Sequence, residues 1–375
     1  MYQRELQNIL SGTIGKREII ILYGARQVGK TTLLQQMEMQ IPDSKIFNCE
    51  RLIVSEILES RDLSAIKALF ESNKIIMLDE AQKILNIGSV LKLIYDELPQ
   101  YQIIATGSSS FELANKIVEP LTGRNYKFKM FSLSLSEIRE KKGWLTLIEN
   151  INDLLIYGSY PGVIDLPPSE KSQKLFELSS DYLFQDILAY DSIKNPSILK
   201  KLLKALALQI GAQVSVNELS NLLGIRRPNI EKYLDLLEKS FVIISISSLS
   251  TNLRNEIKKS KKYYFLDLGI RNAIINNFSH ISNRSDIGAL WENFCIIERI
   301  KWLNINQPFT NLYFWRTYDG AEIDLVEESN SQFKIFEFKW NKKKRKQKIP
   351  LNFTNAYGVN KINVITSGNL HQLID

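Results

Sequence analysis

The sequence has few of the residues from which proteins build covalent or metal-held frameworks. Its 375 residues include two cysteines, Cys49 and Cys295, and two histidines, His280 and His371. Two distant cysteines in apolar contexts predict buried thiols in a reducing compartment and exclude a disulfide framework. The four residues together show no spacing typical of a zinc site.

Long apolar runs are also missing. No stretch approaches the roughly 20 residues of a membrane span, and the N-terminal residues 1–7 have no apolar signal core. The chain shows no internal repeat and no low-complexity tract. We therefore expect a cytoplasmic protein with no membrane partner.

The bulk composition is that of a globular protein with more than one domain. Hydrophobic residues make up 44% and charged residues 24% of the chain, which are ordinary fractions. A length of 375 residues exceeds what one hydrophobic core usually organises, so we expect two or three domains. The net charge of +7 favours a polyanionic partner only if the basic residues cluster.

Residues 1 to about 140 alternate short apolar runs with helical patterns. The runs predict strands, and the segments between them predict helices such as Thr31–Met39 and Val90–Leu98. Apolar strands separated by helices are typical of a parallel sheet covered on both faces. The predicted strands are Glu18–Tyr23, Lys45–Asn48, Ile75–Leu78 and Ile103–Thr106.

A glycine-rich segment joins the first of these strands to its helix. It has the pattern G-x-x-x-x-G-K-[S/T], in which glycines let backbone amides and a helix N-terminus face phosphate groups. Lys30 would reach the β- and γ-phosphates, and the Thr31 hydroxyl would bind magnesium. The predicted ATP-binding residues of this segment are Gly24, Ala25, Arg26, Gln27, Val28, Gly29, Lys30, Thr31 and Thr32.

Adjacent carboxylates end the strand Ile75–Leu78. Asp79 would hold Mg²⁺ through water, and Glu80 would orient or deprotonate an attacking water. The alternative is an acidic cap for the next helix. With Lys30 the pair predicts a catalytic site for ATP hydrolysis.

Three further residues are candidates for the γ-phosphate. Thr106 and Ser108 follow the strand Ile103–Thr106, where either hydroxyl could sense this group. Arg124 could contact phosphate in its own chain or in a neighbouring subunit, or it could be a surface arginine. The sequence is thus compatible with a monomer and with an oligomer.

The residues of these motifs, together with motifs further along the chain, resemble those of a group of prokaryotic AAA-type ATPases. In that group a P-loop domain is followed by a winged helix and a C-terminal domain similar to PD-(D/E)XK nucleases. The resemblance covers nearly the whole chain and implies ATP binding and a cytoplasmic location. The motifs lie at residues 24–34, 78–83, 106–109, 121–124, 132–137, 157–162, 290–294, 316–324 and 337–339.

The segment from 213 to 268 reads as two helices joined at Gly224, followed by strands Phe241–Ser247 and Lys262–Leu266. A winged helix of this kind could place its second helix in the major groove of DNA, or it could contact protein only. Helical spacing predicts a small core of Leu219, Leu222, Leu223, Ile230, Leu234 and Leu237. The candidate phosphate contacts are Arg226, Arg227, Arg254, Lys258, Lys259, Lys261 and Lys262.

The C-terminal segment predicts a helix, three strands, a helix and a strand, the order of the PD-(D/E)XK nucleases that the resemblance implies. Their chemistry uses carboxylates that bind magnesium and a lysine that acts on the attacking water. Asp324 and Glu337 would bind the metal, Lys339 would act on the water, and Glu292 would complete the acidic set. The alternative is a structural ion pair. A basic run, 342–348, could grip a phosphate backbone or be a solvated loop.

Together these observations predict an α/β protein with three parts. They are an AAA-type P-loop ATPase domain at 1–140, a helical and winged-helix domain at 141–280, and a nuclease-like α/β domain at 281–375. The expected cofactors are ATP and Mg²⁺. The expected partner is DNA or RNA; the alternative is a nucleotide-dependent switch or scaffold that binds a protein and cleaves nothing.

Overall fold

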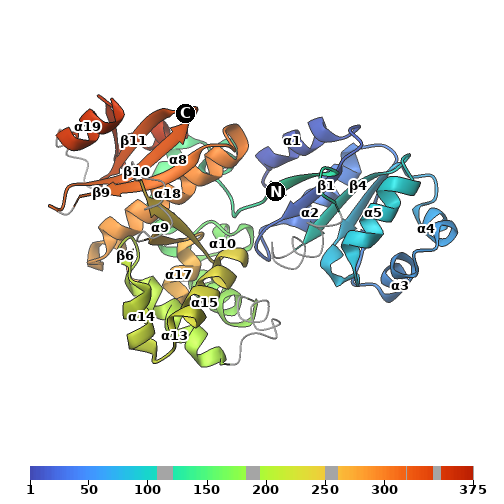
Figure 1. Ribbon diagram of the computed structural model, residues 1–375, viewed down its shortest axis with the longest axis horizontal. Helices are drawn as coiled ribbons and strands as arrows, with labels where there is room; N and C mark the ends of the chain where they lie inside the picture. Colours follow the sequence, from blue (N-terminus) through green and yellow to red (C-terminus); the bar gives the residue numbers. More distant parts are fainter. Residues whose placement is uncertain (108–120, 183–194, 250–260, 318, 341–347, 375) are drawn as a thin grey trace. The chain divides into compact units, whose positions relative to one another are not determined.

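A computed structural model describes residues 1–107, 121–182, 195–249, 261–317, 319–340 and 348–374. The chain forms two compact units (Figure 1). The first comprises residues 1–133 with 239–241, and the second comprises residues 134–238 with 242–375. Each unit is described by itself below.

The first unit is a five-stranded sheet with the order β2-β3-β4-β1-β5, in which every neighbouring pair is parallel. The predicted strands are confirmed to within one or two residues at their ends, whereas the helix predicted at Val90–Leu98 begins earlier, at Ile87. The elements are α1 (Glu5–Thr13), β1 (Ile19–Tyr23), α2 (Lys30–Gln40), β2 (Ser44–Asn48), α3 (Leu52–Ser60), α4 (Leu63–Phe70), β3 (Ile75–Asp79), the 3₁₀ helix η1 (Ala81–Lys83), α5 (Ile87–Glu97), β4 (Gln102–Gly107) and β5 (Asn125–Lys129).

Both faces of this sheet are buried, as the apolar strands predict. Ile19 and Ile21 pack in a cluster that includes residues of α3, α4 and α5, and the alternate residues Ile20 and Leu22 are also buried. The chain leaves β1 for β2 at one edge of the sheet and returns through β3 to β4 beside β1, before β5 on the other side. This reversal of strand order at β1 is where parallel sheets bind ligands.

The second unit contains one seven-stranded sheet with the order β12-β11-β10-β9-β7-β8-β6. Strand β7 pairs in parallel with β9, Ser247 beside Tyr313, so the segments predicted as separate domains share this sheet. The elements before the C-terminal helix are α7 (Leu135–Lys142), α8 (Trp144–Glu149), α9 (Ile151–Tyr157), α10 (Pro161–Ile164), α11 (Pro168–Glu177), the π-helix η2 (Leu178–Tyr182), α13 (Pro196–Leu208), β6 (Gln213–Val214), α14 (Val216–Leu223), α15 (Arg227–Lys239), β7 (Ile243–Ser248), β8 (Lys261–Phe265), α17 (Leu268–Ile274) and η3 (Ile281–Asn283).

The C-terminal elements follow the predicted order of helix, three strands, helix and strand. They are α18 (Ile287–Asn306), β9 (Asn311–Arg316), β10 (Glu322–Ser329), β11 (Gln332–Phe338), α19 (Leu351–Tyr357), β12 (Ile362–Ile365) and a final 3₁₀ helix, η4 (Leu370–Leu373). The 20-residue α18 is buried along much of its length, including the fully buried Trp291. Among the described residues, no helix is both long enough and apolar enough to cross a membrane.

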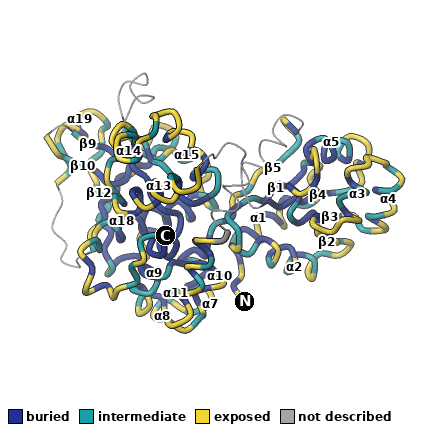
Figure 2. The backbone as a smooth tube through the Cα atoms, turned by 90° about the horizontal axis from the view of Figure 1, so that it is seen from below, coloured by how far each residue is buried: buried dark blue, intermediate teal, exposed yellow. Residues whose placement is uncertain are grey.

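The two helices α14 and α15 form as predicted, and exposed residues line their outer faces (Figure 2). Most of the expected small core is buried, but Leu222 is 63% exposed, so its inclusion in that core was wrong. Leu219 is only 1% exposed, whereas Leu222, three positions further along the same helix, lies on its solvent-exposed side. Helical spacing identified the apolar stripe but not its width.

The loop after α9 is held by a buried carboxylate. Asp267 accepts hydrogen bonds from the backbone N–H of Ser159 at 2.9 Å and of Gly269 at 2.9 Å, where it also caps α17. Gly158 has φ of +69°, and a Cβ there would overlap the Asp267 carboxylate. The glycine is therefore required by both conformation and space.

Candidate functional site

The phosphate-binding loop lies at the carboxyl end of β1, and its lysine points into it. Lys30 is 4% exposed, and its Nζ donates to the carbonyl oxygens of Gly24 at 2.9 Å and Ala25 at 2.8 Å. Gln27 and Gly29 have positive φ values, +59° and +98°. A Cβ at Gly24 would overlap the carbonyl oxygen of Met130, so glycine is needed at this close approach.

Asp79 joins the loop to the neighbouring strands. Its Oδ2 accepts from the Thr31 hydroxyl at 2.7 Å, and its Oδ1 accepts from the Thr106 hydroxyl at 2.6 Å. Because β4 lies between β1 and β3, the three side chains meet at the carboxyl ends of these neighbouring parallel strands. A hydroxyl and a carboxylate are the oxygen ligands that Mg²⁺ prefers, so Thr31 and Asp79 fit the expected cation.

Glu80 follows β3 in a left-handed conformation, with φ of +55°. Its N–H donates to the Thr106 hydroxyl at 3.2 Å, and its Oε2 accepts from Gln82 at 2.5 Å. A non-glycine residue at positive φ is held there by its surroundings and is often functional. The Thr106 hydroxyl is thus engaged by both carboxylate-bearing residues.

A second group of carboxylates lies in the C-terminal sheet. Asp324 on β10 and Glu337 on β11 are 8% and 3% exposed, one step beyond the paired residues Leu325 and Phe336. The register of β10 against β9 shifts between Ile323 and Val326, a stretch of strand that includes Asp324. Bulges redirect side chains and are frequent beside active sites.

The electrostatics of this group reflect crowded negative charge. Burial raises the pKa of Asp324 well above its usual range, and the carboxylates of Glu292 and Glu337 raise it further. Burial also raises the pKa of Glu337. The ion pair between its Oε1 and Lys339 Nζ, at 2.5 Å, lowers this pKa but does not outweigh the effect of burial. Like charges held together in this way favour protonation or a bound cation.

Glu292 is near this pair, but its carboxylate has other partners. Its Oε1 accepts from Lys262 Nζ at 3.1 Å and from the Tyr264 hydroxyl at 2.8 Å. Lys262 also pairs with Glu322 at 2.5 Å. Within the described ranges, no three His, Cys, Asp or Glu side chains are arranged to hold a metal ion.

Comparisons with known proteins agree with the N-terminal site. Residues 16–139 match a family described as an AAA domain, and the Walker-type ATPase paby2304 of Pyrococcus abyssi has a similar fold. That structure aligns with a TM-score of 0.51 and 16% identity over 73% of this chain and 96% of its own. Residues 16–139 are therefore similar to AAA domains, and the first unit has the fold of a Walker-type ATPase.

The rest of the chain matches families whose function is not described. Residues 148–280 and 287–372 match two domains of unknown function, DUF8612 and DUF4143. An uncharacterized protein of Mycobacterium tuberculosis is 25% identical over 90% of this chain and 74% of its own. Another, from Methanocaldococcus jannaschii, is 25% identical over 88% of this chain and 77% of its own.

Arg124 is not at the nucleotide site of its own ATPase domain. It precedes β5, and its carbonyl accepts from the N–H of Ile19, at the amino end of β1. Its Nε pairs with Asp96 at 3.4 Å, and four residues of strand, about 13 Å, separate this edge from the loop. Arg124 could contact phosphate in its own chain or in a neighbouring subunit, and this position is compatible only with the second. Ser108 lies outside the described residues.

The expected basic surface of the second unit is only partly visible. Lys262 was predicted to contact phosphate, but it is 2% exposed and bound to carboxylates, so that interpretation was wrong. A lysine on an alternating strand faces either solvent or the interior, and the sequence alone does not choose. Arg227 is exposed and pairs with Glu231 at 2.8 Å. Arg254, Lys258, Lys259 and 342–347 lie outside the described residues.

Two contacts at the candidate sites were not predicted from the sequence. Arg4 binds the carbonyl oxygen of Val28 in the phosphate-binding loop at 2.6 Å, and nothing in the pattern around it marks this role. Tyr264 binds Glu292, and the alternation Lys262, Tyr264 along β8 is the signal that could have placed both on the face of the acidic group.

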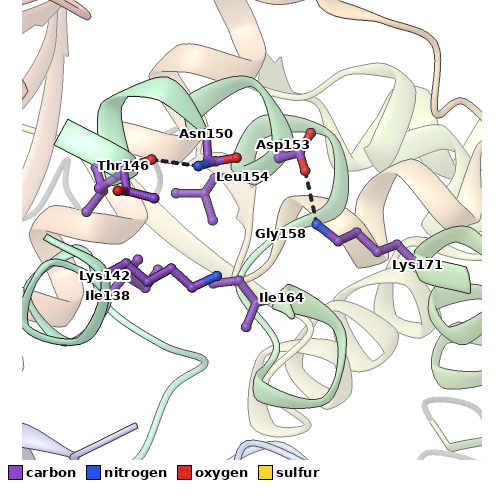
Figure 3. A pocket seen from close by; sticks show the side chains of 10 residues that line it. Ile138, Lys142, Thr146, Asn150, Asp153, Leu154, Gly158, Ile164 and Lys171 are labelled. Atoms are coloured by element: carbon purple, nitrogen blue, oxygen red, sulfur yellow. Dashed lines mark hydrogen bonds and ion pairs between the residues drawn. The ribbon is translucent and has the colours of Figure 1, made fainter. Parts of the chain in front are cut away.

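A hollow with polar walls lies among α7 to α11 (Figure 3). Lys171 lines it and pairs with Asp153 at 3.0 Å, and Lys142 pairs with Asp165 at 2.6 Å. Since both lysines already meet carboxylates, we assign no ligand to this hollow.

Proposed function

We propose that the protein hydrolyses ATP at the P-loop site, with Glu80 as the residue that orients or deprotonates the attacking water. The observation that carries this proposal is the position of Asp79, which binds both the Thr31 and the Thr106 hydroxyls. These contacts bring the side chains of Thr31, Asp79 and Thr106 together, and Glu80 directly follows Asp79. Mg²⁺ bound by Thr31 and Asp79 would neutralise charge on the β- and γ-phosphates.

In this proposal Lys30 changes acceptors when nucleotide binds. Its present acceptors are two carbonyl oxygens of the loop, and phosphate oxygens are stronger acceptors because they are charged. Glu80 is held by Gln82 and by the Thr106 hydroxyl until water and substrate are in place. The residues of the loop bind and orient, and Glu80 moves the proton.

The test compares ATP turnover by the wild type with that of Lys30→Ala and Glu80→Gln. Lys30→Ala should lose binding and hydrolysis, whereas Glu80→Gln should keep nucleotide binding and lose hydrolysis. Lys74→Ala is the matched control, because Lys74 is an exposed lysine of the same domain, paired only weakly with Asp43 at 3.8 Å. Unchanged turnover in Glu80→Gln would contradict the role of that residue.

We further propose that the second unit binds a divalent cation at Asp324 and Glu337 and cleaves nucleic acid, with Lys339 acting on the attacking water. The specific support is the register of β10 against β11, which brings Asp324 and Glu337 side by side, together with the raised pKa values of both groups. A divalent cation would relieve this crowding of charge and supply a nucleophile from bound water. Glu292 would anchor the site through Lys262 and Tyr264.

Cleavage is tested with single-stranded, duplex and branched DNA and with RNA, in Mg²⁺ and in Mn²⁺. Asp324→Asn should abolish any cleavage by the wild type, and Glu328→Gln, on the same strand, serves as the control. If the wild type cuts none of these substrates, the cleavage proposal fails. The alternative, a nucleotide-dependent switch that binds a protein partner, would then be tested by capture on Glu80→Gln with ATP.

A further inference from the structure

A buried arginine outside every motif contacts the phosphate-binding loop. Arg4 precedes α1 and is 7% exposed. Its Nη1 donates to the carbonyl oxygen of Val28 at 2.6 Å, and its Nη2 donates to that of Phe131 at 2.7 Å. The side chain therefore bridges two backbone segments that are 103 residues apart in the sequence and that follow the neighbouring strands β1 and β5.

The contact at Val28 acts on a peptide group that belongs to the nucleotide site. The carbonyl of Val28 and the N–H of Gly29 are parts of one peptide unit, so they point in opposite directions. In loops of this type the N–H groups face the phosphates. A guanidinium on the carbonyl side polarises the peptide and makes its N–H a stronger donor to negative charge.

The contact at Phe131 reaches the segment through which the chain leaves the ATPase domain. Residues 130–133 follow β5, and Leu133 is the last residue of the first unit before Ser134. This segment also meets the start of the loop, because Met130 N–H donates to Tyr23 at 2.8 Å and Gly24 packs against the Met130 carbonyl. The exit segment is thus tied to the loop at its beginning and, through Arg4, near its end.

We propose that Arg4 is a positioning residue of the nucleotide site: it fixes the Val28–Gly29 peptide toward the phosphates and couples this peptide to the exit segment, residues 130–133. The proposal rests on the proposed nucleotide site. Arg4 touches neither nucleotide nor water in this role; it acts through the backbone of the loop. The guanidinium suits it because one planar group presents separate donors to two carbonyl oxygens.

The kinetic test separates positioning from a purely structural role. Arg4→Met should raise KM for ATP and the inhibition constant of ADP by the same factor, about tenfold, with kcat within about threefold of the wild type. Loss of folded protein alone would lower kcat and leave KM unchanged. Arg4→Lys keeps the positive charge but not the planar guanidinium with its separate donors. Its KM for ATP should lie between those of the wild type and Arg4→Met. Arg17→Met is the control, because Arg17 contacts Tyr95 instead of the loop.

Hydrogen exchange tests the coupling. In the wild type, ADP should slow exchange of the backbone amides in 130–133, and Arg4→Met should lose this response at saturating ADP. If Arg4→Met does not fold, Arg4→Lys carries both measurements. A KM within twofold of the wild type in a folded Arg4 variant would overturn the proposal. A wild type that binds ATP without turnover contradicts only hydrolysis, since ADP affinity measured by calorimetry still decides the role of Arg4.

Discussion

Thr106 offers the sharpest test of how the ATPase site is organised. Its hydroxyl donates to Asp79 at 2.6 Å and accepts from the Glu80 N–H at 3.2 Å, and the residue is fully buried. Thr106→Val keeps the shape of the side chain and removes both hydrogen bonds. The carboxylate of Asp79 and the backbone of Glu80 would lose the contact that fixes them relative to each other.

The magnitude follows from the kind of bond that is lost. A hydrogen bond to a charged group contributes about 1.5–3 kcal/mol, and valine would offer no acceptor to the half-buried Glu80 N–H. If this contact orients the site in the transition state, kcat should fall by about 10- to 100-fold. KM for ATP should change little, because Lys30 and the loop are untouched.

The assay is steady-state ATP hydrolysis with thermal unfolding measured in parallel. Thr106→Ser, which restores the hydroxyl, should recover most of the rate. Thr13→Val is the control, since Thr13 is also buried in this unit and its hydroxyl donates to the carbonyl of Ile9 in the same helix at 2.8 Å. A folded Thr106→Val with a kcat within threefold of the wild type would refute the reasoning. A selective loss of ATP over ADP binding would instead indicate direct contact with the γ-phosphate.

Three further outcomes are expected. Gly158→Ala should lower the free energy of unfolding by about 3 kcal/mol or more, measured in urea, because it combines a positive φ with overlap at Asp267, whereas Gly162→Ala should not. Burial alone would raise the pKa of Asp286, but hydrogen bonds from Arg284 and Arg271 lower it to about 2. Its contribution to stability is therefore complete above about pH 4 and is lost as the pH falls toward 2, and Asp286→Asn should flatten this part of the stability profile. If Arg124 serves a neighbouring subunit, specific activity should rise with protein concentration, and Arg124→Ala should remove that rise; an activity independent of concentration would contradict action between subunits.

The sequence predicted the parts of the fold that depend on local pattern. Strand positions in the first unit, the loop Gly24 to Thr31 and the order of the C-terminal elements all follow from apolar periodicity and glycine placement. Burial of both cysteines is confirmed. These features depend only on residues close together in the sequence, so a single sequence is enough to predict them.

The remainder depends on contacts between distant residues. The bridge from Arg4 to Val28 and Phe131, the burial of Lys262, and the pairing of β7 with β9 join segments that no periodicity links. For Arg124, the local sequence suggested a contact that the arrangement of distant strands does not allow within one chain. Its motif suggested phosphate contact, but strand register puts it at the amino end of β1. Register is set by the whole sheet, and composition near the residue does not reveal it.

The pairing of β7 with β9 joins two segments of the chain that match different families. Backbone hydrogen bonds cross from the segment matched at 148–280 to the segment matched at 287–372. Either segment expressed alone would present an unpaired strand edge, which is a template for aggregation. The two segments therefore depend on each other to complete one sheet, although they match two separate families.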